Sequence, residues 1–172
     1  VERDPAYGRV SMLFTQIWLR GIYEDTLTAP DPAKLEPVTR QIARLGKLLV
    51  SDRRAERLRL ARGAATARVL GLWEEVDVLL TPGLARTAVA AEAGYGRSLP
   101  YAVNLAGTFT PWTPPFNLTG QPAMTIPAGT GSDGLPLSVQ LVGRLGAEDT
   151  LYSLAGQLES ARPWADRRPE LP

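Results

Sequence analysis

The amino-acid sequence predicts an α/β fold in which helices cover a β-sheet. Apolar residues recur at helical spacing through residues 1–75, and short β-branched segments broken by Gly and Pro follow from residue 76 onward. With 172 residues, 44% of them hydrophobic, the chain suffices for one domain or a large piece of a bigger one. We expect residues 1–75 to form a helical region packing on the sheet, and residues 76–172 to form strands, a pocket loop and a closing helix of the same domain.

Three helices are expected before the sheet. The first covers residues 11–27 and stops at the Thr-Ala-Pro-Asp-Pro run of 28–32, which breaks a helix. The second covers 32–50, with Asp31 as its N-cap, because a short acidic side chain can accept the first free backbone N–H groups. The third covers 52–75, where small Ala residues permit close packing.

Three strands and a closing helix are expected afterwards. The run 76–82 is apolar nearly throughout, which predicts a strand covered on both faces. Residues 123–128 and 137–143 predict an antiparallel pair, because an Asp-Gly turn signal lies between them. The closing helix is expected over 148–159. The intervening residues 83–114 are expected to form a loop, which either lines a pocket or is mobile.

Charge and residue usage exclude several functions. The net charge is +1, from 19 basic and 18 acidic side chains, so nothing predicts attraction to nucleic acid or membranes. The Arg-rich stretch 53–62 is interpreted as a solvated helix face, with an RNA-binding arm as the weaker alternative, because no aromatic residue is interleaved for base stacking. No apolar run is long enough for a membrane span.

Cys and His are both absent, which removes the Cys nucleophile, the usual general base and the commonest metal ligands. Lys47 and Ser51 stand four residues apart on a predicted helix, but we interpret them as a surface pair, since nothing nearby predicts an oxyanion site. The acids of 74–77 and 148–149 occupy ordinary helix-end positions. No metal site is expected.

The first residues, Val1–Pro5, lack both an initiator Met and a signal-peptide layout, and we interpret them as a cut edge. The absence of Cys and of a signal fits the cytoplasm.

Four stretches of the chain, in this order, resemble the C-terminal portion of amidase-signature enzymes. The Pro-Phe-Asn-Leu-Thr-Gly-Gln-Pro-Ala run of 115–123, continuing to Pro127, is the most specific of them. The others are 76–82, 133–144 and the closing helix with Trp164 after it.

The resemblance implies an α/β/α fold with a mixed β-sheet covered by helices. It also implies hydrolysis of a carboxylic amide to acid plus ammonia or amine, without a cofactor. The family's nucleophile is a Ser, relayed to a Lys through a second Ser, in a Gly/Ser-rich run that this sequence lacks. No catalytic residue therefore carries over, and we expect this chain alone to be inactive.

The expected partners follow from the same resemblance. They are the missing N-terminal amidase region, as the same or a separate chain, and a small-molecule amide substrate, and a homodimer is a looser expectation. The alternative is a non-catalytic scaffold or binding subunit with an amidase-like fold.

The resemblance also implies where substrate is bound, since the family's chain approaches its substrate just before the Phe-Asn-Leu-Thr-Gly helix. Trp112 and Phe116 are candidates for an apolar wall. The candidates for hydrogen bonds to substrate are Thr110, Thr113 and Asn117. Packing and capping of the short helix are the alternative roles for Phe116 and Asn117.

Overall fold

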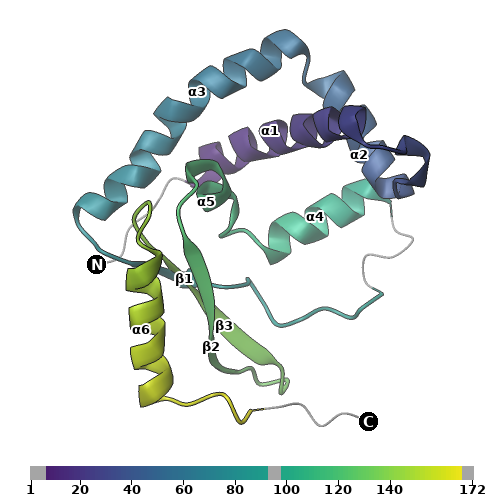
Figure 1. Cartoon of the computed structure of the whole chain (residues 1–172). Coiled ribbons are helices and arrows are strands. Elements are labelled where there is room, and N and C mark those ends of the chain that lie inside the picture. Colours follow the sequence, from purple (N-terminus) through teal and green to yellow (C-terminus); the bar gives the residue numbers. More distant parts are fainter. Residues whose placement is uncertain (1–6, 93–97, 168–172) are drawn as a thin grey trace.

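Helices that cover a β-sheet make up the protein, as the sequence predicts, and the sheet of the described residues is a small antiparallel one (Figure 1). The computed structural model describes residues 7–92 and 98–167, so the interpretation of Val1–Pro5 lies outside the described residues. The elements in chain order, with two 3₁₀ turns marked η, are α1 (Tyr7–Thr28), η1 (Pro32–Lys34), α2 (Pro37–Leu49), α3 (Asp52–Leu70), η2 (Gly71–Glu74), β1 (Leu79–Pro82), α4 (Leu99–Phe109), α5 (Pro114–Thr119), β2 (Ala123–Thr130), β3 (Pro136–Val142) and α6 (Glu148–Ala161).

The first and last predicted helices are confirmed as α1 and α6, but the second prediction was wrong in its extent. Asp31 does act as a cap, accepting the Ala33 N–H at 3.1 Å, yet it caps only the 3₁₀ turn η1. Helix α2 begins afresh at Pro37, because proline restricts the preceding residue to extended backbone. The third predicted helix ends at Leu70, and its last turn tightens into η2.

The predicted pair of strands is confirmed, and β3 lies in the middle of the sheet order β1-β3-β2. A register shift falls between Pro127 and Gly129, where Gly129 adopts a φ of 130° that other residues rarely adopt. The expectation that residues 76–82 form a strand covered on both faces was wrong for the described residues. Strand β1 is an edge strand here, pairing with β3 alone, and Leu80 is 63% exposed.

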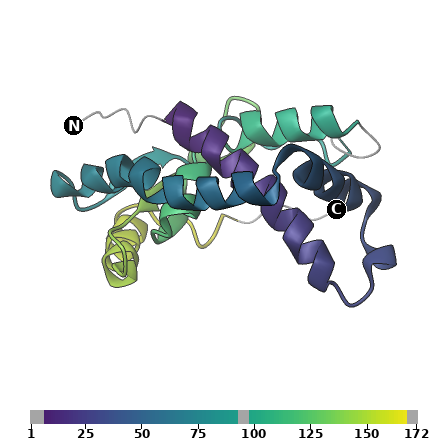
Figure 2. The same ribbon diagram turned by 90° about the horizontal axis from the view of Figure 1, so that it is seen from above.

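Helices lie on both faces of the sheet, because neighbouring residues of β3 point to opposite sides. Val142 joins the larger core cluster, in which residues of α1, α3 and α5 meet. Leu141 faces the other way and packs in a second cluster with Leu151 of α6. Figure 1 shows α6 running beside the sheet, and the view from above in Figure 2 has α6 on one side of the molecule and α1 and α4 toward the other. The order helix, sheet, helix is that of an α/β/α arrangement.

Helix α1 is the centre of the larger helical layer. It contacts α2, α3 and α5, and Figure 2 shows from above how it crosses α3. Side chains of the Arg-rich stretch reinforce these crossings: Arg54 donates to Gln16 at 2.9 Å, and Arg59 pairs with Glu24 at 2.9 Å. Both arginines are exposed, in agreement with a solvated helix face. Their guanidinium groups, however, connect α3 to α1. Among the described helices, none is long and apolar enough to cross a membrane.

The short helix α5 is fixed at its C-terminal end. Gly120 takes the left-handed conformation, with φ 75°, and its N–H donates to Phe116 O at 2.8 Å. The buried side chain of Gln121 then donates to Gly143 O at 3.1 Å, which connects the end of the helix to the end of β3. Arg62 of α3 donates to Leu118 O at 2.9 Å, which satisfies a free carbonyl of the last turn. These contacts fix the C-terminal end of α5 against α3 and the end of β3.

Candidate functional site

A pocket of about 490 Å³ lies between α1, α4 and the segment that leads into α5. This volume falls in the range of small-molecule sites. The lining residues are Ser11, Phe14, Thr15, Trp18, Val103, Ala106, Gly107, Thr110, Pro111, Trp112, Thr113, Pro114 and Asn117. We call this cavity the α1–α4 pocket.

Four of the five residues predicted to bind substrate line this pocket: Thr110, Trp112, Thr113 and Asn117. Phe116 does not. Its ring is 4% exposed and lies in the core, where it helps to position α5 from beneath.

Two of the predicted threonines point their hydroxyl protons at backbone oxygens. Thr110 Oγ1 donates to Ala106 O at 3.0 Å, and Thr113 Oγ1 donates to Thr110 O at 3.3 Å. Because the proton is used, each hydroxyl oxygen presents lone pairs that can accept a hydrogen bond from a ligand N–H group.

Asn117 complements these acceptors. Its side chain is exposed and has no hydrogen-bond partner within the part of the chain that the structure describes. A carboxamide offers two N–H donors and a carbonyl acceptor, so it can pair with another carboxamide in both senses.

One wall of the pocket was not predicted from the sequence. Phe14 and Trp18 come from α1, about a hundred residues earlier in the chain, and Trp18 is 37% exposed. A second wall is α4, from which Val103, Ala106 and Gly107 line the pocket. The expectation that residues 83–114 form a loop is wrong for this helix. Of the described residues of the segment 83–114, only the last part lines the pocket, and much of that lining comes from helix α4.

Among the described residues that line the α1–α4 pocket, none carries an ionisable side chain. These residues suit a neutral molecule and include no general acid or base. The Lys47 and Ser51 pair lies elsewhere: the Lys47 ammonium stands 5.8 Å from the centre of the Tyr23 ring, and Ser51 caps α3 by accepting the Arg54 N–H at 3.4 Å. Both side chains have structural contacts, in agreement with their interpretation as surface residues.

Fold and pocket together define an α/β protein with a neutral cavity of ligand size. The family model for amidases matches residues 18–152. The chain belongs to the amidase family, which confirms the amidase-signature resemblance.

Among curated proteins, the chain is similar to "Putative amidase AmiB2" of Mycobacterium tuberculosis (strain ATCC 25618 / H37Rv). The two are 42% identical over 172 residues, which cover 99% of this chain and 37% of that protein. A segment of 60 residues is 53% identical to the 6-aminohexanoate-cyclic-dimer hydrolase of Paenarthrobacter ureafaciens, covering 35% of this chain and 12% of that enzyme. The chain thus spans little more than a third of the length of the mycobacterial relative.

Two solved structures that superimpose on this chain are a hydrolase and an amidase by their names. The structure of 6-aminohexanoate cyclic dimer hydrolase superimposes with a TM-score of 0.71 at 27% identity, covering 91% of this chain and 36% of that one. A crystal structure of an amidase reaches a TM-score of 0.75 at 22% identity, covering 90% of this chain and 36% of that one, and supports the fold alone.

Proposed function

We propose that this chain forms the substrate-binding portion of an amide hydrolase and that the α1–α4 pocket holds the substrate. The observation that carries the proposal is the combination of a neutral, partly aromatic pocket with an unengaged carboxamide, Asn117, in a member of the amidase family. The proposed substrate is an amide whose acyl group is small or aryl, because Trp18, Trp112 and Phe14 offer flat apolar surfaces.

The proposed reaction is acyl transfer to a serine. The hydroxyl oxygen attacks the amide carbon, ammonia or an amine leaves with a proton, and water then releases the acid. The serine and its lysine partner would belong to amidase sequence outside these 172 residues, because the chain contains no Gly/Ser-rich run. By itself the chain is expected to bind amides without hydrolysing them.

Asn117 has the central role in the proposed recognition. Its carboxamide would pair with the substrate amide, while the hydroxyl oxygens of Thr110 and Thr113 accept any remaining N–H. Phe116 packs in the core and thereby anchors α5, which fixes the position of the adjacent Asn117.

The test compares Asn117→Ala with Asn104→Ala in an amidase of which this chain is part, with benzamide as substrate. Asn104 makes a matched control, because it is also an exposed helical asparagine but does not line the pocket. We expect Asn117→Ala to lower kcat/KM about tenfold, the effect of losing one or two hydrogen bonds, and Asn104→Ala to leave it unchanged.

Two results would contradict the proposal. Equal losses for the two variants would mean that Asn117 has no special contact with substrate. Benzamide binding without hydrolysis by the complete protein would favour the non-catalytic scaffold instead.

A further inference from the structure

A second cavity, of about 270 Å³, lies on the face of the sheet that α6 covers. Its floor is apolar and comes from all three strands, with Leu80 of β1, Ile126 of β2 and Val139 of β3. Trp164 and Leu158 close it from the side of α6. We call this cavity the tail pocket; it shares no lining residue with the α1–α4 pocket.

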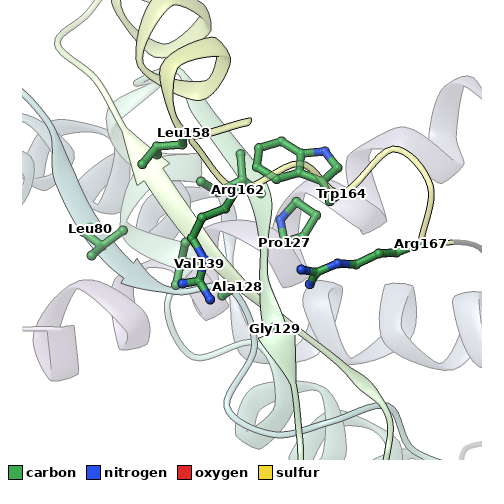
Figure 3. Close-up of a pocket in the computed structure, with 10 residues that line it drawn as sticks. Leu80, Pro127, Ala128, Gly129, Val139, Leu158, Arg162, Trp164 and Arg167 are labelled. Atoms are coloured by element: carbon green, nitrogen blue, oxygen red, sulfur yellow. The ribbon is translucent and has the colours of Figure 1, made fainter. Parts of the chain in front are cut away.

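Two arginines are the charged residues of the tail pocket. Arg162 is the residue that ends α6, and its N–H donates to Leu158 O at 2.9 Å. Arg167 follows a turn in which its own N–H donates to Trp164 O at 3.0 Å. Figure 3 shows both guanidinium groups turned toward the strands, with the Trp164 ring close by. The backbone hydrogen bonds before and after Trp164 therefore place the side chains of Arg162 and Arg167 at the same cavity.

No described residue of the cavity neutralises these charges. No acidic residue belongs to its lining, and within the described residues neither guanidinium has a hydrogen-bond or ion-pair partner. Two cations beside one cavity repel each other, and an anion bound between them would offset this repulsion. The planar guanidinium group matches a carboxylate, with which it can form two parallel hydrogen bonds.

We propose that the tail pocket binds a small carboxylic acid with a flat apolar body. The carboxylate would be held by Arg162 and Arg167, and the apolar body would lie on Trp164 and the strand side chains. The volume is just below the usual range for drug-sized ligands, which favours an acid with a single ring. This site goes beyond the proposed hydrolysis and does not depend on it.

The test is a titration of the chain with 3-phenylpropionate, followed by the indole N–H signals in NMR. The four tryptophans report on separate places: Trp164 on the tail pocket, Trp18 and Trp112 on the α1–α4 pocket, and Trp73 on the core. We expect a saturable shift of the Trp164 signal. The neutral 3-phenylpropionamide, which has the same ring, should leave that signal in place.

The second part of the test removes the two positive charges. The double variant Arg162→Gln, Arg167→Gln should raise the Kd of the acid about tenfold or more, because a charge-assisted hydrogen bond is lost at each position. Arg68→Gln is the matched control: it removes the charge of an exposed arginine on α3, outside the pocket. All three side chains are exposed, so the fold should be retained, which circular dichroism checks.

The proposal is overturned if 3-phenylpropionate shifts only the Trp18 or Trp112 signals. An equal response of Trp164 to acid and amide would likewise overturn it, as would an equal loss of affinity for Arg68→Gln.

Discussion

The ring of Trp73 meets the ring of Phe116 edge to face, with centroids 6.2 Å apart and planes at 90°. Trp73 belongs to η2, which follows the N-terminal helices. Phe116 belongs to α5, the helix whose residue Asn117 lines the α1–α4 pocket. Both rings are 4% exposed. This contact connects the helical layer to the segment that carries Asn117, so the position of the pocket depends on core packing.

Phe116→Ala should therefore destabilise the protein strongly. Removal of a buried phenyl ring leaves a cavity and costs about 3–5 kcal/mol in the free energy of unfolding. Tyr152→Ala is a control for loss of an aromatic ring, since Tyr152 is 70% exposed on α6, and its cost should stay within about 0.5 kcal/mol. Urea denaturation measures both. A small loss for Phe116→Ala would show that the ring is not part of a well-packed core.

The crossing of α1 and α2 depends on the absence of a side chain at Gly46. A Cβ added there would overlap the backbone carbonyl of Leu19. We expect Gly46→Ala to push the helices apart at a cost of about 1–3 kcal/mol in unfolding free energy. Gly21→Ala, also within a helix but with no heavy atom within 4 Å of the added Cβ, should instead stabilise by about 0.5–1 kcal/mol. Thermal unfolding measures both variants. A loss of stability for Gly46→Ala beside a gain for Gly21→Ala supports the close crossing, whereas a change of the same sign in both contradicts it.

Glu24 is the centre of an ion-pair network between α1 and α3. Arg20 Nε donates to its carboxylate at 2.7 Å and Arg59 donates at 2.9 Å, while Arg20 also pairs with Asp52 at 2.6 Å. The hydrogen bond from Arg20, helped by that from Arg59, holds the pKa of the Glu24 carboxyl below its ordinary value, although partial burial opposes the shift. The same contact with Glu24 raises the pKa of Arg20.

A lowered pKa in the folded state determines the direction of the pH effect. The contribution of Glu24 is complete above its unfolded pKa of about 4.3 and is lost as the pH falls through the lower folded pKa. Glu24→Gln should cost about 1 kcal/mol or less at pH 7, because the Glu24 side chain is 36% exposed and its charge is screened by solvent. The variant should also lose less stability than the parent when unfolding is measured from pH 5 downward. Identical acid profiles would contradict a network role for Glu24.

Local patterns predicted most of the elements but not how distant segments meet. The Asp-Gly turn predicted the pairing of β2 with β3, because this signal is contained in neighbouring residues. Helix α4 was missed because its flanking Gly and Pro residues favoured a loop, although Leu99, Val103 and Ala106 follow a helical spacing.

Of the candidate site, the sequence predicted only the segment that the family resemblance covers. Four of its five residues line the α1–α4 pocket, and the fifth, Phe116, belongs to the core, since both environments select a large apolar side chain. Trp18 is not among the predicted site residues, because an apolar side chain at helical spacing is typical of an amphipathic helix. Its place in the same pocket lining as Thr110 depends on the packing of α1 against α5, which no local pattern contains.

Trp18 should determine which amides the proposed enzyme prefers. Its ring lines the α1–α4 pocket and is only partly covered by the protein, so it offers a surface on which an aryl group can stack. In an active amidase that contains this chain, Trp18→Ala should lower kcat/KM for benzamide about tenfold and leave acetamide nearly unchanged, because acetamide has no ring to lose contact. Met12→Ala is the control, since Met12 is 64% exposed on the same helix and lies outside the pocket lining. An unchanged ratio of the two kcat/KM values in Trp18→Ala would remove Trp18 from the proposed site, and an equal drop in Met12→Ala would assign the effect to the helix as a whole.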